Sequence, residues 1–194
     1  MRIGVLGGTF DPPHLGHLAV ARDVATQLQL DRIVFAPTGD SWQKETTTPA
    51  KDRLAMVDLA IAGEELFVSS DIDVQRDGPT FTFDTLVQLR AEYGADAELF
   101  FLLGSDALAG LPTWHRASEL GQLATFVGFG RPGHDPITPA GFESWVHIVS
   151  VTPTEISSTQ CRQKLAAGDS VAGLMPQAVI DYATARGLYA GVRE

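Results

Sequence analysis

Two histidines, His14 and His17, stand three residues apart in the stretch GGTFDPPHLGHL, which covers residues 7–18. Side chains three apart at the start of a helix project from one face, so both imidazoles could act on a single ligand. Imidazole N–H groups can stabilise negative charge that develops on a phosphate oxygen during group transfer. A zinc pair is an alternative, but no third ligand is obvious nearby. Ordinary surface or helix-capping histidines are the other alternative, which the pair by itself leaves open.

The glycines just before these histidines favour the phosphate interpretation. Gly7 and Gly8, followed by Thr9, end an apolar run and can turn sharply, because glycine has no Cβ and tolerates positive φ. A phosphate can therefore approach the backbone closely. The loop then enters a predicted helix, whose first N–H groups lack intrahelical partners and carry partial positive charge. Neither the G-x-G-x-x-G pattern of hydride-transfer enzymes nor the G-x-x-x-x-G-K-[ST] pattern of a P-loop occurs in the chain.

Alternating strands and helices must position this loop. Short apolar runs predict strands, and apolar residues at helical spacing predict helices. The predicted strands cover 2–6, 32–37, 66–74, 98–106, 124–133 and 145–151. The predicted helices cover 17–30, 50–62, 80–94, 157–167 and 176–186, with Thr48 as cap and Pro49 as first residue of the second. The run 98–106 is the most apolar, which places it near the centre of the sheet.

This alternation predicts an α/β fold. We expect a doubly wound, Rossmann-like, mostly parallel sheet with helices on both faces and a C-terminal helical segment over about 152–194. In such sheets ligands bind outside the carboxyl ends of the strands. Glycines, hydroxyl side chains and charged residues gather after most of the predicted strands. The binding site should therefore lie along that edge of the sheet.

Length and composition limit the class of protein. With 194 residues, 44% of them hydrophobic and 20% charged, the chain matches one globular domain with a sizeable core. The net charge of −10 and a pI near 4.8 speak against nucleic acid and anionic membranes as partners, because both need clustered Lys and Arg. A small anionic ligand can still be held by a local pocket.

The sequence also bears on the compartment in which the protein is found. The first residues lack the pattern of an export signal, and no run of about 18 apolar residues occurs, so we expect a cytoplasmic protein without a membrane segment. The single cysteine, Cys161, excludes an internal disulfide and fits a reducing compartment. The sequence leaves open whether the chain forms a homo-oligomer.

Two separated motifs resemble the signatures of the nucleotidyltransferase superfamily. The stretch GGTFDPPHLGHL contains the (T/H)-x-G-H core as His14-Leu15-Gly16-His17, and ISSTQCR at 156–162 resembles the second signature at the start of a late helix. Segments between them are similar to one branch, the bacterial nicotinate-nucleotide adenylyltransferases. These segments are PTGDSWQK (37–44), PTFTFDTL (79–86), GSDAL (104–108), PTWH (112–115) and GRPG (130–133). The resemblance covers nearly the full length and implies one nucleotidyltransferase domain over residues 1–194.

The resemblance implies a reaction as well. AMP would pass from ATP to nicotinate mononucleotide, which gives nicotinate adenine dinucleotide and pyrophosphate in a step of NAD synthesis. The mononucleotide phosphate would attack the α-phosphorus of ATP directly and in line. Mg²⁺ would accompany ATP, held mostly by phosphates and water, so no protein metal site is expected. Positioning and charge stabilisation would then supply the rate.

Site residues follow from the matched motifs. The catalytic residues would be His14, His17, Lys44 and Arg162. The ATP-binding residues would be Gly7, Gly8, Thr9, Phe10, His14, His17, Ile156, Ser157, Ser158, Thr159 and Arg162. The residues that bind nicotinate mononucleotide would be Thr85, Gly104, Asp106, Trp114, His115 and Arg131. Trp114 would stack on the pyridine ring, and the backbone N–H groups of Thr85 and His115 would bind its carboxylate.

Several of these residues also have a plainer interpretation. A lone lysine such as Lys44 is commonly a solvated surface residue, the Ser-Ser-Thr run could simply cap a helix, and Trp114 could belong to the core. Cys161 stands where an aliphatic residue is commoner in the family, and we expect it to be buried packing and not a nucleophile. Gly130 likewise replaces a residue that is often polar.

Three other functions are alternatives to this one. A pantetheine-phosphate adenylyltransferase should lack the TFTFDTL and PTWH segments. A class I aminoacyl-tRNA synthetase would need a tRNA-binding surface and a K-M-S-K-S segment, and the latter is absent from the chain. A non-catalytic nucleotide sensor would be expected to have lost His14, His17, Lys44 or Arg162, and all four are present.

Overall fold

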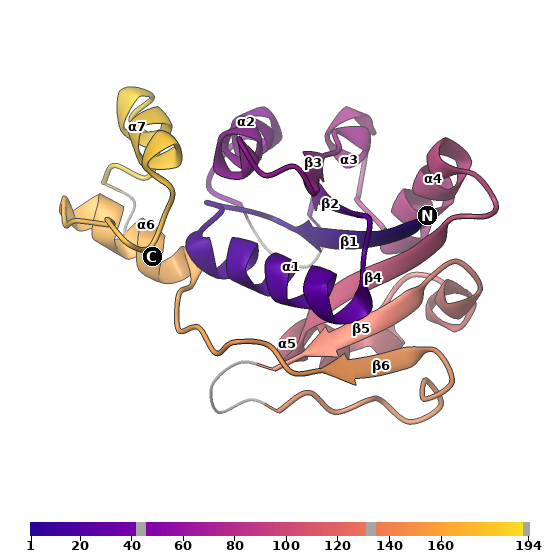
Figure 1. Cartoon of the computed structure of the whole chain (residues 1–194). Coiled ribbons are helices and arrows are strands. Elements are labelled where there is room, and N and C mark those ends of the chain that lie inside the picture. Colours follow the sequence, from indigo (N-terminus) through magenta and orange to yellow (C-terminus); the bar gives the residue numbers. More distant parts are fainter. Residues whose placement is uncertain (42–45, 131–134, 192–194) are drawn as a thin grey trace.

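A computed structural model of the chain describes residues 1–41, 46–130 and 135–191. Within these ranges six strands form one sheet, in the order β3-β2-β1-β4-β5-β6, and all neighbouring strands run parallel (Figure 1). The strands are β1 (Arg2–Gly8), β2 (Arg32–Pro37), β3 (Phe67–Ser69), β4 (Glu98–Gly104), β5 (Thr125–Phe129) and β6 (Val146–Val149). The α/β prediction of a doubly wound parallel sheet is confirmed, with the apolar run of β4 near the middle.

Helices cover both faces of the sheet. The helices α1 (Leu15–Leu28) and α2 (Ala50–Ile61) pack on one face in a core cluster that includes Leu6 and Phe35. The other face packs on α4 (Thr82–Tyr93), α5 (Ser105–Gly110) and two 3₁₀ turns, η1 (Leu111–Thr113) and η2 (Ala117–Gln122). Alternate strand residues enter opposite cores, as Val5 and Leu6 do, because successive side chains of a strand point to opposite faces.

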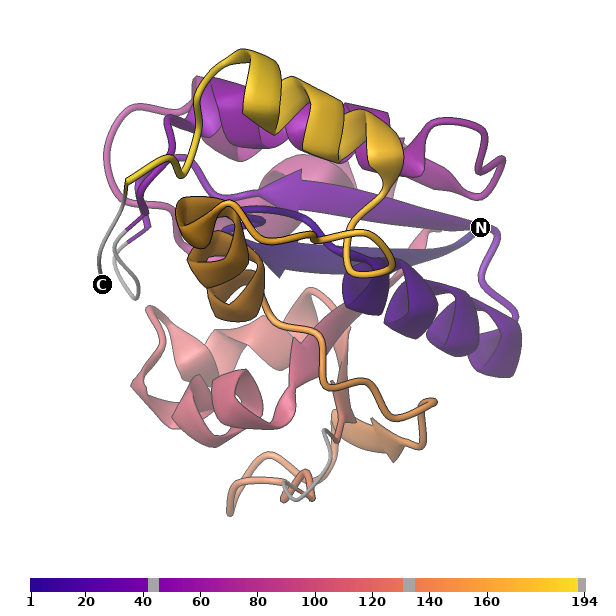
Figure 2. The same cartoon turned by 90° about the vertical axis from the view of Figure 1, so that its left-hand side faces the viewer.

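The C-terminal helices form a third cluster with α2. The helices α6 (Ser158–Ala167) and α7 (Gln177–Ala185) lie beyond the carboxyl end of β1, and α7 runs beside α2 (Figures 1 and 2). Met56 of α2 meets Cys161 and Val179 in this cluster, and all three are fully buried. The predicted packing role of Cys161 is therefore confirmed. In the part of the chain that the structure describes, no helix is both long and apolar enough to cross a membrane.

Several predicted boundaries were wrong. The predicted strand 66–74 ends at Ser69, and a short helix, α3 (Ile72–Gln75), follows, because Asp73 turns inward to meet Thr85. The predicted strand 98–106 ends at Gly104, and α5 begins at the next residue, Ser105. The strands predicted over 124–133 and 145–151 end at Phe129 and Val149, and residues 131–134 of the former lie outside the described residues.

The predicted start of the second helix also needs correction. Pro49 is the cap of α2 and makes no side-chain capping bond, whereas Thr48 was the expected cap. Thr48 is buried instead, and its carbonyl accepts a hydrogen bond from Nε of Arg53. The preference of threonine for the cap position is overridden here because the buried guanidinium of Arg53 needs carbonyl acceptors, and the Thr48 carbonyl is one of them.

The connections of the strands define where a ligand can enter. After β1 the chain moves outward to β2 and β3, and from β4 it moves to the other side through β5 and β6. β1 and β4 are neighbours, with Leu6 paired to Leu102 near their carboxyl ends. Such a reversal of strand order leaves a crevice at the carboxyl ends, where open α/β sheets bind ligands.

Candidate functional site

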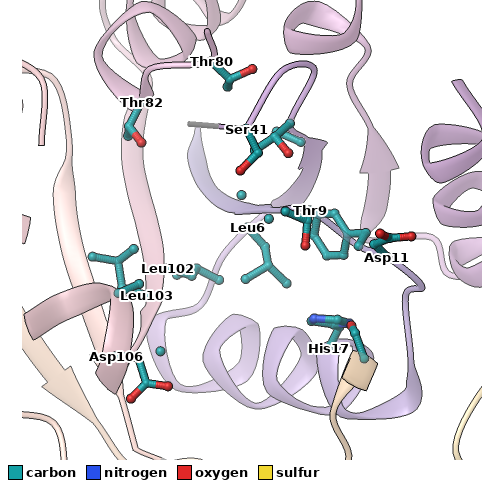
Figure 3. Close-up of a pocket in the computed structure, with 18 of the residues that line it drawn as sticks. Leu6, Thr9, Asp11, His17, Ser41, Thr80, Thr82, Leu102, Leu103 and Asp106 are labelled. Atoms are coloured by element: carbon teal, nitrogen blue, oxygen red, sulfur yellow. The ribbon is translucent and has the colours of Figure 1, made fainter. Parts of the chain in front are cut away.

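A cavity of about 410 Å³ lies at this crevice (Figure 3). It is lined from five directions, by the loop after β1, the end of β2, the α3–α4 region, the end of β4 with α5, and the start of α6. Most of the predicted site residues line it, namely Gly7, Gly8, Thr9, Phe10, His14, His17, Thr85, Gly104, Asp106, Trp114, Ser157, Ser158, Thr159 and Arg162. Motifs that are up to 155 residues apart, from Gly7 to Arg162, therefore meet in one pocket.

Four predicted residues are not among these. The imidazole of His115 lies against the ring of Phe81, with centroids 4.5 Å apart, outside the lining of the large cavity. Ile156 lines a smaller cavity of about 40 Å³, which His14 and His17 also line. Lys44 and Arg131 lie outside the described residues.

The two histidines form a stacked pair. Their ring centroids are 3.7 Å apart with 24° between the planes, and the backbone N–H of His14 donates to Nδ1 of His17 (3.2 Å). Because Nδ1 of His17 accepts this bond, the proton of a neutral His17 ring is on Nε2, which is then a donor. His14 is buried, whereas His17 is half-buried and faces the pocket from α1 (Figure 3). The geometry is that of an oriented hydrogen-bond donor at the pocket wall.

The start of α1 offers fewer free amides than the sequence predicted. The backbone N–H of Leu15, the first residue of the helix, donates to the carbonyl of Leu174 (2.8 Å), and that of His17 donates to the carbonyl of His14 (3.0 Å). The segment between α6 and α7 thus caps α1 from outside. The expectation of a helix end with all its first N–H groups available is wrong at these two residues.

The start of α6 is a second feature that could bind an anion. Ser157 caps the helix by accepting from the backbone N–H of Gln160 (3.1 Å), which leaves the first N–H groups of α6 near the cavity. Ser158 Oγ donates to the carbonyl of Pro12 (2.8 Å), so α6 is tied to the loop after β1. Nη1 of Arg162 donates to the carbonyl of Asp11 (2.9 Å). A helix N-terminus, two hydroxyls and a guanidinium therefore converge with the histidine pair on one region.

Arg53 of α2 was missed by the sequence reading, although it holds the site together. Its side chain is 1% exposed and donates to the carbonyls of Thr9 (2.6 Å), Thr38 (2.6 Å) and Gly39 (2.9 Å). The loops after β1 and β2 are thereby joined through one guanidinium. Burial lowers the pKa of Arg53, and the negative charge of Asp11 opposes that shift. An arginine among apolar helix residues looks like a surface residue in sequence, so no local signal marks it.

The opposite wall of the pocket is built around Trp114 and α4. Trp114 meets Phe101 edge to face (centroids 6.2 Å apart) and is half-buried, so part of its indole remains accessible in the pocket. The backbone N–H of Thr85 donates to the carbonyl of Phe81 (3.2 Å), and its hydroxyl donates to Asp73 (2.8 Å). The Thr85 N–H thus already has a protein acceptor within α4, which starts at Thr82, and its use for a ligand carboxylate stays a prediction.

A buried carboxylate supports that wall. Asp73 is buried and is paired with Arg76, whose Nη1 lies 2.7 Å from Oδ1. Burial raises the pKa of Asp73 above its ordinary value, and the hydrogen bond from Thr85 and the charge of Arg76 oppose the shift only in part. Sequence reading missed Asp73, and it also missed Asp11, Thr38, Ser41, Thr80 and Thr82, which all line the pocket.

The charged side chains that line the cavity limit which ligands could bind there. Among the lining residues that the structure describes, Asp11, Asp73 and Asp106 are acidic and Arg162 is the single arginine or lysine. Asp106 and Asp11 lie on opposite sides of the pocket (Figure 3). Over the described ranges, no group of three or more His, Cys, Asp or Glu side chains is arranged to hold a metal ion. A metal that enters with a nucleotide would have phosphate oxygens as its main ligands.

Comparisons with known proteins agree with this geometry. The model of the cytidylyltransferase-like family matches residues 5–164. A probable nicotinate-nucleotide adenylyltransferase of Streptomyces coelicolor is 48% identical, with 96% of this chain and all of the relative covered. A protein of the same description from Acidothermus cellulolyticus is 46% identical, over 97% of this chain and 94% of the relative.

Solved structures share the fold at lower identity. A Plasmodium falciparum nicotinic acid mononucleotide adenylyltransferase complexed with NaAD superposes with a TM-score of 0.78 at 21% identity, over 97% of each chain. A putative nicotinate-nucleotide adenylyltransferase from Vibrio parahaemolyticus gives a TM-score of 0.70 at 19% identity, over 98% of this chain and 96% of the other. At these identities the likeness concerns the fold.

Proposed function

This chain belongs to the nicotinate-nucleotide adenylyltransferase family of the cytidylyltransferase-like enzymes, and from that membership we propose that its pocket transfers AMP from ATP to nicotinate mononucleotide. The products are nicotinate adenine dinucleotide and pyrophosphate. The structural observation that supports this proposal most directly is that the His14–His17 pair, the start of α6 and Trp114 line one cavity. Residues 1–194 act as one nucleotidyltransferase domain in this proposal.

The phosphate end of the pocket supplies the chemistry. A phosphate oxygen of nicotinate mononucleotide attacks the α-phosphorus of ATP, the bond from this phosphorus to the bridging oxygen breaks, and pyrophosphate leaves. Nε2–H of His17 and the guanidinium of Arg162 donate to phosphate oxygens as charge shifts onto them. The N–H groups at the start of α6 add partial positive charge near the same phosphate oxygens. Little covalent chemistry is needed, so the rate comes from alignment and charge stabilisation.

The other end of the pocket selects the acceptor. The accessible indole of Trp114 stacks on the pyridine ring, and its edge contacts with Phe101 and Phe126 hold it in place. Since the Thr85 N–H is used within α4, the carboxylate of nicotinate is better served by the N–H groups of Thr82 and Phe83, in the first turn of that helix. Nicotinamide would leave those donors poorly matched.

A divalent metal accompanies ATP in nucleotidyltransferases, and we take it to be Mg²⁺. In this proposal the ion arrives with the nucleotide and is held mostly by its phosphates and water, since Mg²⁺ commonly keeps several waters and binds substrate phosphates. Lys44 and Arg131 remain predicted phosphate ligands. A cytoplasmic location stays a prediction, and whether the chain forms a homo-oligomer stays open.

The test is pyrophosphate release by the purified protein with MgATP and a panel of phosphorylated acceptors. We expect release with nicotinate mononucleotide and at least tenfold lower kcat/KM with nicotinamide mononucleotide, which corresponds to about 1.4 kcal/mol or more. Equal rates with nicotinate and nicotinamide mononucleotide would refute the selectivity. Release with phosphopantetheine and with no other acceptor would indicate the sister activity. If none of the acceptors gives pyrophosphate, transfer of AMP is refuted altogether.

A further inference from the structure

Asp11 is a buried carboxylate that joins segments far apart in the chain. It is 2% exposed, and its Oδ2 accepts from both the backbone N–H (2.7 Å) and the hydroxyl (3.0 Å) of Thr47. Its Oδ1 accepts from the hydroxyl of Tyr189 (2.7 Å). Three protein donors thus occupy most of the lone-pair directions of one carboxylate. Negative charge also disfavours direct contact with a nucleotide phosphate, so Asp11 is suited to act through its neighbours.

The main chain at Asp11 carries two contacts to the phosphate end of the pocket. Its carbonyl accepts from Nη1 of Arg162 (2.9 Å), and the carbonyl of the next residue, Pro12, accepts from Ser158 Oγ (2.8 Å). Both donors belong to α6 and line the cavity. Any shift of the Asp11 backbone would therefore move the anchor of the guanidinium that faces the phosphates.

Tyr189 reaches this point from the C-terminal segment, beyond α7. It is 3% exposed, and its hydroxyl also lies 4.0 Å from Sδ of Met56 in the third core cluster. Burial and the negative charge of Asp11 raise the pKa of the phenol well above its ordinary value, so the hydroxyl stays a hydrogen-bond donor at every working pH. The donor and the carboxylate are both fixed by their surroundings.

We propose that Asp11 and Tyr189 are a positioning pair that sets the loop after β1 against α6 and thereby shapes the ATP phosphate site. The inference rests on the proposed function only in taking ATP as the ligand of that site. It assigns a role to the C-terminal segment, which supplies a side chain that holds the nucleotide loop from behind. Neither residue is placed on the substrate.

Tyr189→Phe tests the pair directly, because it removes one hydroxyl and keeps the ring. Titration calorimetry with Mg²⁺ and α,β-methylene-ATP should show affinity lowered by about tenfold, the effect of losing a hydrogen bond to a charged group. The KM for ATP should rise similarly, while the KM for nicotinate mononucleotide stays within about twofold, since the acceptor wall is untouched. A merely structural role would lower the melting temperature but leave the affinity of the folded protein unchanged.

Tyr182→Phe is the matched control. Tyr182 also donates to a carboxylate, Oδ1 of Asp52 (2.8 Å), in the contact between α7 and α2. Neither residue lines the cavity. This variant loses the same kind of bond at a half-buried contact away from the cavity, and its ATP affinity should match that of the wild type.

Thr47→Val approaches the same carboxylate from the other side. Thr47 is exposed, so folding is not at risk, and the variant should weaken binding of the ATP analogue in the same direction, by about threefold or more. Thr47→Ser keeps the hydroxyl and should bind the ATP analogue with wild-type affinity. Wild-type affinity in both Tyr189→Phe and Thr47→Val would overturn the proposal. A wild-type protein that binds the analogue but releases no pyrophosphate would instead refute the proposed function alone.

Discussion

The imidazole of His17 is fixed by the main chain of His14, whose N–H donates to Nδ1 at 3.2 Å while the two rings stack. The hydrogen bond selects the ring nitrogen that remains a donor, and stacking limits rotation of the ring. The pair therefore arrives at the pocket already oriented, which reduces the reorganisation needed when charge develops on a phosphate.

His17→Ala should lower kcat about 100- to 1000-fold, because it removes a donor that acts on developing charge. The KM for ATP should change much less than kcat. Steady-state pyrophosphate release measures both. His147→Ala is the control, since His147 is exposed on the edge strand β6 and does not line the pocket. A His17→Ala enzyme with near-normal turnover would remove this residue from the transition state.

Arg53→Lys should destabilise the protein by about 2–4 kcal/mol, although it conserves the charge. A lysine ammonium cannot reproduce the fork that reaches the carbonyls of Thr9, Thr38 and Gly39, so buried acceptors are left unpaired. Urea unfolding followed by fluorescence gives the free energy of unfolding. Arg22→Lys, at an exposed ion pair with Glu64, should cost less than about 1 kcal/mol. Equal effects at the two sites would show that the Arg53 network contributes little.

Asp73→Asn should change how stability depends on pH. The pKa of Asp73 is raised in the folded protein, so the folded state binds its proton more tightly than the unfolded state does. Its contribution to stability is therefore largest below the unfolded pKa, near 3.8, and falls as pH rises through the folded pKa. Unfolding free energies measured from pH 4 upward should fall less with pH for Asp73→Asn than for the wild type. Parallel pH profiles would contradict the raised pKa.

Cys161 should be inert to alkylation in the native protein. Its thiol is fully buried in α6, and burial raises its pKa to about 11, so little thiolate exists at pH 8. Iodoacetamide at that pH should leave the mass of the folded protein unchanged and modify the urea-unfolded protein. Cys161→Ala should retain kcat and lose about 1–2 kcal/mol of stability. Rapid modification of the native state would show that α6 opens readily.

The local pattern of apolar residues predicted the strongly apolar strands. It gave wrong boundaries where contacts with distant residues set the local structure. The strands β1, β2 and β4 are recognised because buried parallel strands are nearly continuous apolar runs, although β1 extends two residues beyond the predicted 2–6 and β4 ends two residues before the predicted 106. The segment 66–74 was misread because its alternation resembles a strand, while Asp73 needs the inward turn that brings it to Thr85. Thr48 is not the cap of α2 because its carbonyl accepts a hydrogen bond from the buried side chain of Arg53.

Residue type and local spacing are enough to recognise the α/β class, the succession of the main strands and helices, and the two motifs that identify the family. Which amides remain available is visible in the folded chain alone, as at Leu15, whose N–H donates to the carbonyl of Leu174 (2.8 Å). The tertiary structure alone brought Arg53 and Tyr189 to the nucleotide loop. The physical reason is that a buried donor must find an acceptor, and that acceptor can lie anywhere along the chain.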